Sequence, residues 1–420
     1  MTAVIGILNK SAVALAADSA VTISGSNGRK IFNTANKIFT LSKFHPVGIM
    51  IYSSASLMST PWETIIKIYR QKLKDKSFPT VKEYQDDFIG FLKTSNYFTT
   101  IETQKLYFKS LVEAEINDIF KEALENFPND NTIDTDEYLK IILQEIIKLL
   151  NQTQEEEELA EDFKSYSFTD FVSFSDEPIQ EILTERFGEY LNDDLISAVQ
   201  QYFYNYIRND NFERGSTGLV FAGFGDDEIY PSLCSIEVGE IFDNRLRYFV
   251  RDEDKVNDDC DGIIVPYAQT DVIKTIIEGI NPYLENTYIS TFAEFMSKYN
   301  NQIIDIIGGT NPELAEKLSK LNIRNIVLEF EESLNKVKTE THIIPTVQTV
   351  ATLSKEDLAE MAESMIYLTY LKRRISFAEE SVGGPVDVAL ISKTDGFIWI
   401  KRKHYFKPEL NQHFITNYFN

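Results

Sequence analysis

The sequence predicts an α+β protein in which β-sheets are layered on each other and combined with amphipathic helices. Residues 2–8 and 12–17 are almost continuously apolar over strand length, and the polar residues 9–11 between them predict a turn. Strands that are apolar on both faces need cover on both faces, which indicates a layered sandwich. Residues 101–127 and 134–150 carry apolar side chains at spacings of three and four, which predicts helices.

The composition limits the class of protein. The chain has 420 residues, of which 43% are apolar and 12% aromatic, enough to bury a large core. Its 41 Lys and Arg against 65 Asp and Glu give a net charge of −24, which makes nucleic acid and anionic membranes poor partners. Two cysteines, Cys234 and Cys260, cannot form a disulfide framework. No basic residue precedes the first apolar run, so we expect no signal peptide and a cytoplasmic protein.

Two strand starts follow the first hairpin, and each begins with a lysine. After a glycine-containing loop at 24–29, the runs 30–32 and 37–39 begin with Lys30 and Lys37. Either lysine enters the inner region that also holds the first strands. The pattern does not choose between them.

Thr2 is a candidate nucleophile that needs a base. None of the four histidines belongs to a recognisable nucleophile motif, and the chain has no GxSxG, HExxH or phosphate-loop pattern. If Met1 is removed, the α-amine of Thr2 has a reference pKa of roughly 7.7 to 8.0, and part of it is neutral at pH 7. That amine can take the proton of its own hydroxyl.

Asp18 and one lysine complete a coherent set with Thr2. A lysine ammonium close to Thr2 lowers the pKa of the terminal amine, and Asp18 holds that lysine charged and oriented. By themselves, however, three such common residue types favour a purely structural interpretation. In that interpretation Thr2 and Asp18 are ordinary parts of a buried hairpin.

Four stretches resemble one known family in the same order along the chain. TAVIGILNKSAVALAADSAVT (2–22), NKIFTL (36–41), residues 218–239 and residues 353–400 with VGGPVDVALISKTDGFIWI resemble the proteasome β-subunits and their bacterial relatives. These are N-terminal-nucleophile hydrolases. The resemblance implies a four-layer αββα sandwich of two antiparallel sheets flanked by helices, here enlarged by helical insertions.

The resemblance also implies the site residues. NKIFTL is similar to the strand with the family's catalytic lysine, which favours Lys37 over Lys30. Ser53 falls where a backbone N–H binds the oxyanion. Glu379 falls where the family has an aspartate that orients the terminal amine.

Two further positions around the terminal amine are less regular. Val382 replaces the family's serine, for which Ser381 is a substitute. The resemblance places a further supporting serine in the stretch VPYAQTDVI, near residues 267–269.

The excess length is expected in two places. The resemblance implies a sandwich core made of residues 1–76, 190–280 and 351–420. Residues 77–189 form a first helical insertion and residues 281–350 a second one.

The predicted function is hydrolysis of peptide bonds by Thr2, without a metal or organic cofactor. The expected partners are peptide or unfolded protein substrates and further copies of the chain in a homo-oligomer, with no nucleic acid and no membrane. Two alternatives stay open. One is a non-catalytic scaffold or interaction subunit, and the other is an amidase acting on a small-molecule amide.

Overall fold

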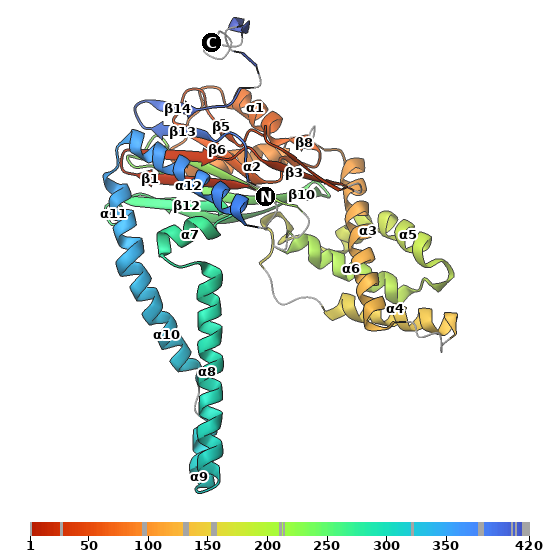
Figure 1. Cartoon of the computed structure of the whole chain (residues 1–420). Coiled ribbons are helices and arrows are strands. Elements are labelled where there is room, and N and C mark those ends of the chain that lie inside the picture. Colours follow the sequence, from red (N-terminus) through yellow and green to blue (C-terminus); the bar gives the residue numbers. More distant parts are fainter. Residues whose placement is uncertain are drawn as a thin grey trace. The chain divides into compact units, whose positions relative to one another are not determined.

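The structure confirms the predicted fold class of an α+β sandwich built from two antiparallel sheets. It is a computed structural model that describes residues 2–25, 28–94, 99–128, 134–152, 158–209, 212, 215–320, 323–376, 382–404, 406–407 and 410–413 (Figure 1). Across these ranges, every helix is too short or too polar to cross a lipid bilayer.

The first sheet contains the N-terminal hairpin at its centre. Its strand order is β12 (Gly262–Ala268), β1 (Ala3–Asn9), β2 (Ala12–Ala17), β13 (Asp387–Ser392) and β14 (Gly396–Lys401). β1 lies between β2 and β12, and β2 lies between β1 and β13. All residues of β1 and β2 are buried, as their continuous apolar pattern predicts.

The second sheet is made of strands from the middle of the chain and from residues 38–53. Its order is β11 (Arg245–Lys255), β10 (Ser232–Phe242), β9 (Thr217–Gly223), β6 (Val47–Ser53) and β5 (Ile38–Thr40). Two small hairpins complete the described strands: β3 (Val21–Gly25) with β4 (Gly28–Phe32), and β7 (Ser56–Leu57) with β8 (Thr60–Pro61).

The chain divides into two compact units. The first contains Met1–Tyr52, Ala222–Leu233 and Asp254–Asn420, and the second contains Ser53–Phe221 and Cys234–Glu253. The division predicted from the sequence, a sandwich core with two helical insertions, stays a prediction.

In the first unit, helices cover the outer face of the first sheet (Figure 1). They are α7 (Asp271–Glu278), α11 (Ile344–Thr352) and α12 (Lys355–Ile375). Ile5 and Ala14 of the sheet belong to one buried cluster with Leu358 and Ile366 of α12. The burial of these apolar faces explains why α12 packs on the hairpin.

A helical hairpin extends the first unit. It consists of α8 (Pro282–Gly308), α9 (Pro312–Ser319) and α10 (Ile323–Lys338), and a π-helical turn (Thr339–Ile343) leads into α11. Asn281 caps α8, and the rings of Phe292 and Phe330 stack with their centroids 4.4 Å apart. Tyr288, Phe295 and Ile306 of α8 are nevertheless exposed.

The second unit contains the remaining helices. They are α1 (Trp62–Leu73), α2 (Val81–Thr94), α3 (Ile101–Asn126), α4 (Thr135–Gln152), α5 (Phe168–Phe187) and α6 (Asp193–Arg208). Phe88 of α2 packs edge-on against Phe221 of β9, with ring centroids 5.5 Å apart. Trp62 of α1 donates a hydrogen bond to Thr217 at 2.8 Å. The helices predicted to begin at residues 101 and 134 are confirmed, because α3 begins at Ile101 and α4 at Thr135.

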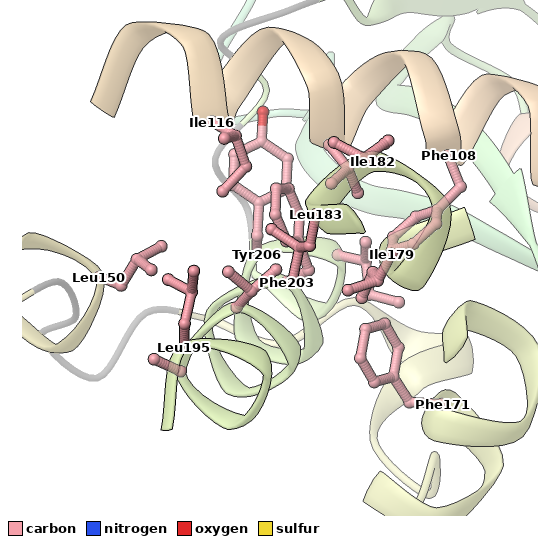
Figure 2. Packing of buried hydrophobic residues seen from close by; sticks show 14 of the residues in the cluster. Phe108, Ile116, Leu150, Phe171, Ile179, Ile182, Leu183, Leu195, Phe203 and Tyr206 are labelled. Atoms are coloured by element: carbon pink, nitrogen blue, oxygen red, sulfur yellow. The ribbon is translucent and has the colours of Figure 1, made fainter. Parts of the chain in front are cut away.

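Helices α3 to α6 share a core of their own. Phe108 of α3 lies in a buried cluster with Phe171 and Ile179 of α5 and Leu195 and Phe203 of α6 (Figure 2). The cluster also includes residues of β10 and β11 from the same unit. Long apolar stripes on these helices are therefore core surfaces.

One glycine controls the spacing between the two sheets within the first unit. A Cβ added to Gly48 of β6 would lie 2.8 Å from a ring carbon of Phe397 and 2.9 Å from Cδ1 of Ile391. Gly48→Ala is therefore expected to destabilise the unit by about 1–3 kcal/mol through overpacking. At Gly308, the last residue of α8, an added Cβ meets its nearest neighbour at 3.8 Å, an ordinary contact. Scanning calorimetry of G48A and the control G308A tests this, and an unfolding temperature of G48A equal to that of G308A would contradict it.

Candidate active site

Thr2 lies directly before β1, and hydrogen bonds hold the main chain on both sides of it. Only 4% of its surface is exposed. Its carbonyl oxygen accepts a hydrogen bond from Gln269 N at 3.3 Å, just beyond β12. The next amide, Ala3 N, donates to Asp18 Oδ1 at 3.0 Å. These bonds fix the start of β1 between β12 and the end of β2.

Asp18 follows β2 and is a fully partnered buried carboxylate. It is 1% exposed. Besides Ala3 N, its donors are Lys37 Nζ at 2.5 Å, Ala20 N at 3.1 Å and Gly383 N at 3.1 Å. A buried charge is tolerated where such partners replace the lost water. Asp18 therefore joins the first hairpin to Lys37 and to the loop before β13.

Lys37 lies directly before β5 and is buried beside Asp18. Its Nζ also donates to the carbonyl oxygen of Ala20 at 2.8 Å. Burial lowers the pKa of Lys37, although Asp18 acts in the opposite direction. The other lysine considered from the sequence, Lys30, is exposed in β4, with its Nζ 5.1 Å from the centroid of the Phe32 ring.

The last residues of β6, which ends at Ser53, lie beside Lys37. Ile51 N donates to the carbonyl oxygen of Lys37 at 2.8 Å. The Tyr52 ring stacks on that of Tyr267, with centroids 5.2 Å apart, and Tyr267 is paired with Val4 in the first sheet. Ser53 is the last residue of β6, has a φ of 69° and belongs to the second unit.

Two of the residues named from the sequence, Glu379 and Ser381, lie outside the described residues. Their neighbour Val382 is 1% exposed and belongs to the apolar cluster between α12 and the first sheet. Valine has no side-chain hydrogen-bonding group, so this position cannot replace a serine hydroxyl. The loop is nevertheless tied to the hairpin, because Ser19 N donates to Gly383 O at 3.0 Å.

A support for Thr2 that the sequence interpretation missed comes from α12. Arg373, near its end, donates hydrogen bonds to the Gln269 side chain and to the Asp271 carboxylate. Because Gln269 also holds the Thr2 carbonyl, α12 is linked to the start of β1. The region near residue 269 was predicted to support Thr2, but Arg373 was not. In the sequence it is one of several basic residues in the last turn of a helix, and no local signal distinguishes it.

The geometry places a buried ammonium–carboxylate pair at the beginning of β1. Interactions between charges are stronger there than at the surface, because little water is present to screen them. Lys37 can hold a positive charge near Thr2, and Asp18 keeps the main chain after Thr2 in one position. In the part of the chain that the structure describes, no group of three or more His, Cys, Asp and Glu residues is arranged to hold a metal ion.

Comparisons with known proteins give similarities to solved structures alone. No family model matches the chain, and no curated protein matches it. One similar structure is the Gly-1 mutant of Anbu from Hyphomicrobium sp. strain MC1, with 8% identity. Another is Anbu from Yersinia bercovieri, described as an ancestral beta-subunit, with 10% identity. Each match has a TM-score of 0.28 and covers 99% of this chain and 94% of the other.

These matches correct the family assignment made from the sequence. The sequence predicted membership of the proteasome β-subunits and their bacterial relatives, whereas the similar structures are Anbu proteins, which form a proteasome-like but distinct family. The assignment to the proteasome β-subunits is therefore wrong. A similarity at a TM-score of 0.28 carries no argument about activity, so the activity has to be inferred from this chain's own residues.

Proposed function

We propose that this protein is a hydrolase of amide bonds that uses Thr2 as an N-terminal nucleophile after the preceding residue has been removed. The observation that carries the proposal is the buried Lys37–Asp18 pair, whose carboxylate also binds the amide directly after Thr2. Such a pair is costly to bury, since two charges leave water. Because the pair lies at the start of β1, its charges can act on the α-amine of Thr2.

The proposed reaction has two steps. The neutral α-amine of Thr2 accepts the proton of the Thr2 hydroxyl, and Oγ forms a bond to the substrate carbonyl carbon. The amine then gives this proton to the leaving nitrogen as the C–N bond breaks. A water molecule hydrolyses the resulting ester and restores Thr2.

Lys37 and Asp18 have distinct roles in this proposal. The ammonium of Lys37 disfavours a second positive charge on the Thr2 amine and keeps part of that amine neutral near pH 7. Asp18 holds Lys37 in place, as its 2.5 Å contact supports. We further propose that the backbone N–H of Ser53 binds the oxyanion and that Glu379 and Ser381 orient the amine.

The proposal includes peptides or unfolded proteins as substrates, a homo-oligomeric assembly and a cytoplasmic location. The exposed apolar side chains of α8, among them Phe295 and Ile306, support contact with further copies of the chain. A sequence with two cysteines, Cys234 and Cys260, fits a reducing compartment.

A non-catalytic scaffold is the second candidate function, and Val382 is the observation that favours it. The resemblance placed an amine-orienting serine at this position, and the structure shows a buried valine. A protein that had lost the chemistry could keep the fold and the Lys37–Asp18 pair.

Labelling with a peptide epoxyketone separates these possibilities, because this probe reacts with a free amine and its neighbouring hydroxyl together. The protein is prepared with Thr2 as its first residue, and intact mass is measured before and after labelling. We expect a single adduct, its complete loss in Thr2→Ala and its retention in Thr2→Ser, which keeps the hydroxyl. The same chain with one extra residue before Thr2 should not react.

Two outcomes would reject the enzyme. One is the absence of an adduct on the correctly processed protein, which favours the scaffold. The other is an adduct that persists in Thr2→Ala. A small-molecule amidase would react with a short acyl probe in preference to the peptide probe.

A further inference from the structure

A second ion pair, with a buried carboxylate and a partly buried lysine, joins two segments near the C-terminus. Asp387, the first residue of β13, is 2% exposed, and its partner Lys403 has a side chain that is 12% exposed. The Lys403 Nζ bonds to Asp387 Oδ2, and the Lys403 backbone N donates to Oδ1 at 2.8 Å. Both carboxylate oxygens of Asp387 therefore bond to the same residue.

This pair lies beside the Asp18–Lys37 pair. Asp387 is the strand partner of Ala17, the residue before Asp18. Gly383, four residues before Asp387, donates its N–H to Asp18. One end of β2 thus brings together two carboxylates and two ammonium groups that are far apart in the sequence.

The second pair acts electrostatically on Lys37. Burial is the largest cause of the lowered pKa of Lys37, Asp18 opposes it, Lys403 lowers the pKa further and Asp387 raises it. Asp18, Lys403 and Asp387 are the charged groups with the largest effects on Lys37 in the described part of the chain. Together with Lys37 they form a cluster with two positive and two negative charges.

A purely structural role does not require these charges. Apolar residues of similar size often stabilise a buried position as well as an ion pair does, because the ions pay a desolvation cost. The Asp387–Lys403 pair also changes the electrostatic potential at the neighbouring Asp18–Lys37 pair. Little water screens this potential, because the site is buried.

We propose that Asp387 and Lys403 are positioning residues that set the electrostatic potential at Lys37 and at the Thr2 amine. The inference rests on the proposed function in so far as the Thr2 amine is the base. Lys403 makes protonation of these two groups less favourable, and Asp387 makes it more favourable. The balance between them decides at which pH the amine becomes neutral.

The two members of the pair should therefore shift the pH dependence in opposite directions. Lys403→Met leaves the Asp387 carboxylate uncompensated, which raises the pKa of the Thr2 amine and moves the acid limb of the reaction to higher pH. Asp387→Asn leaves the Lys403 ammonium uncompensated and moves the limb to lower pH. A shift of about one unit changes the rate on the acid limb about tenfold.

The experiment measures the rate constant of epoxyketone labelling from about pH 5 to about pH 9, the range around the reference pKa of an α-amine. It compares the processed protein with K403M, D387N, the double variant D387N/K403M and K403R. We expect opposite shifts for the two single variants, a pKa close to the original in the double variant, and rescue in K403R, which keeps the charge. The double variant leaves no unpaired charge, so it tests the inference even if the single variants misfold.

Shifts in the same direction, or a loss of rate without any shift, would overturn the inference and leave the pair a merely structural role. A second readout does not need the reaction. In the Thr2→Ala background, the ¹³Cε resonance of Lys37 is titrated by NMR, and K403M and D387N should again shift its pKa in opposite directions.

The two readouts distinguish the failure of this inference from the failure of the proposed function. Opposite NMR shifts in a protein that forms no adduct would support the electrostatic role and reject the hydrolase. An adduct on the original protein with unchanged profiles and an unchanged Lys37 titration in both variants would reject the electrostatic role alone.

Discussion

Replacing Asp18 by asparagine is expected to lower the free energy of unfolding of the first unit by about 3–5 kcal/mol, the cost of breaking a buried ion pair by removing one partner. The carboxylate accepts hydrogen bonds from Lys37, Ala3, Ala20 and Gly383. An amide can accept at one oxygen only, so at least one backbone donor loses its partner. Lys37 also keeps a buried ammonium without a counter-ion.

Hydrogen exchange measured by mass spectrometry on peptides covering residues 3–17 reports this loss, since these strands form the centre of the first sheet. The matched control is the double variant D18N/K37M, which removes the unpaired ammonium as well. We expect the double variant to be more stable than D18N alone. Equal protection in D18N and the original protein would show that the pair contributes nothing to the unit.

Replacing Phe108 by alanine is expected to destabilise the second unit by about 3–5 kcal/mol, the usual cost of truncating a buried aromatic ring to alanine. Phe108 is fully buried in the cluster of Figure 2. Its ring makes edge-on contacts with four other rings, at centroid distances of 5.5 to 5.9 Å, and these belong to Phe171, Phe174, Phe203 and Phe242. Truncation leaves a cavity bordered by three helices and a strand, and so removes dispersion contacts on several sides.

The two tryptophans of the chain allow this loss to be measured in one unit. Trp62 belongs to the second unit and Trp399 to the first. In a Trp399→Phe background, urea denaturation followed by Trp62 fluorescence reports on the second unit. Leu106→Ala, in the same helix at a side chain that is 64% exposed, is the control and should change stability by less than about 0.5 kcal/mol. A Phe108→Ala curve that coincides with the Leu106→Ala curve would disprove the predicted role of the ring.

The local part of the fold follows from the sequence because its signals are short-range. The continuous apolar runs predict the first hairpin, and the structure has β1 and β2 within one residue of the expected bounds. The spacing of apolar residues predicts α3 and α4 for the same reason, since side chains three and four apart lie on one helix face. The family assignment was wrong, because fold-level motifs are shared by distinct families.

The candidate site could be predicted only in part. The sequence named Asp18 and Lys37, which lie nineteen positions apart, and the structure joins them in an ion pair. Glu379 and Ser381 stay predictions, as does the role of Ser53. Arg373 was missed, because its contact with Gln269 joins residues 104 positions apart and leaves no pattern in either segment.

What the sequence by itself determined is the set of elements and the residue types that begin and end them: a buried hairpin, a lysine before a short strand, and long amphipathic helices. What only the tertiary structure decided is which charges share one buried environment. β13 pairs with β2 across more than 350 positions of chain, and this pairing brings Asp387 and Lys403 next to Asp18 and Lys37. Secondary structure depends on neighbours a few residues apart, whereas a buried electrostatic cluster depends on how distant strands align, and local composition does not encode that alignment.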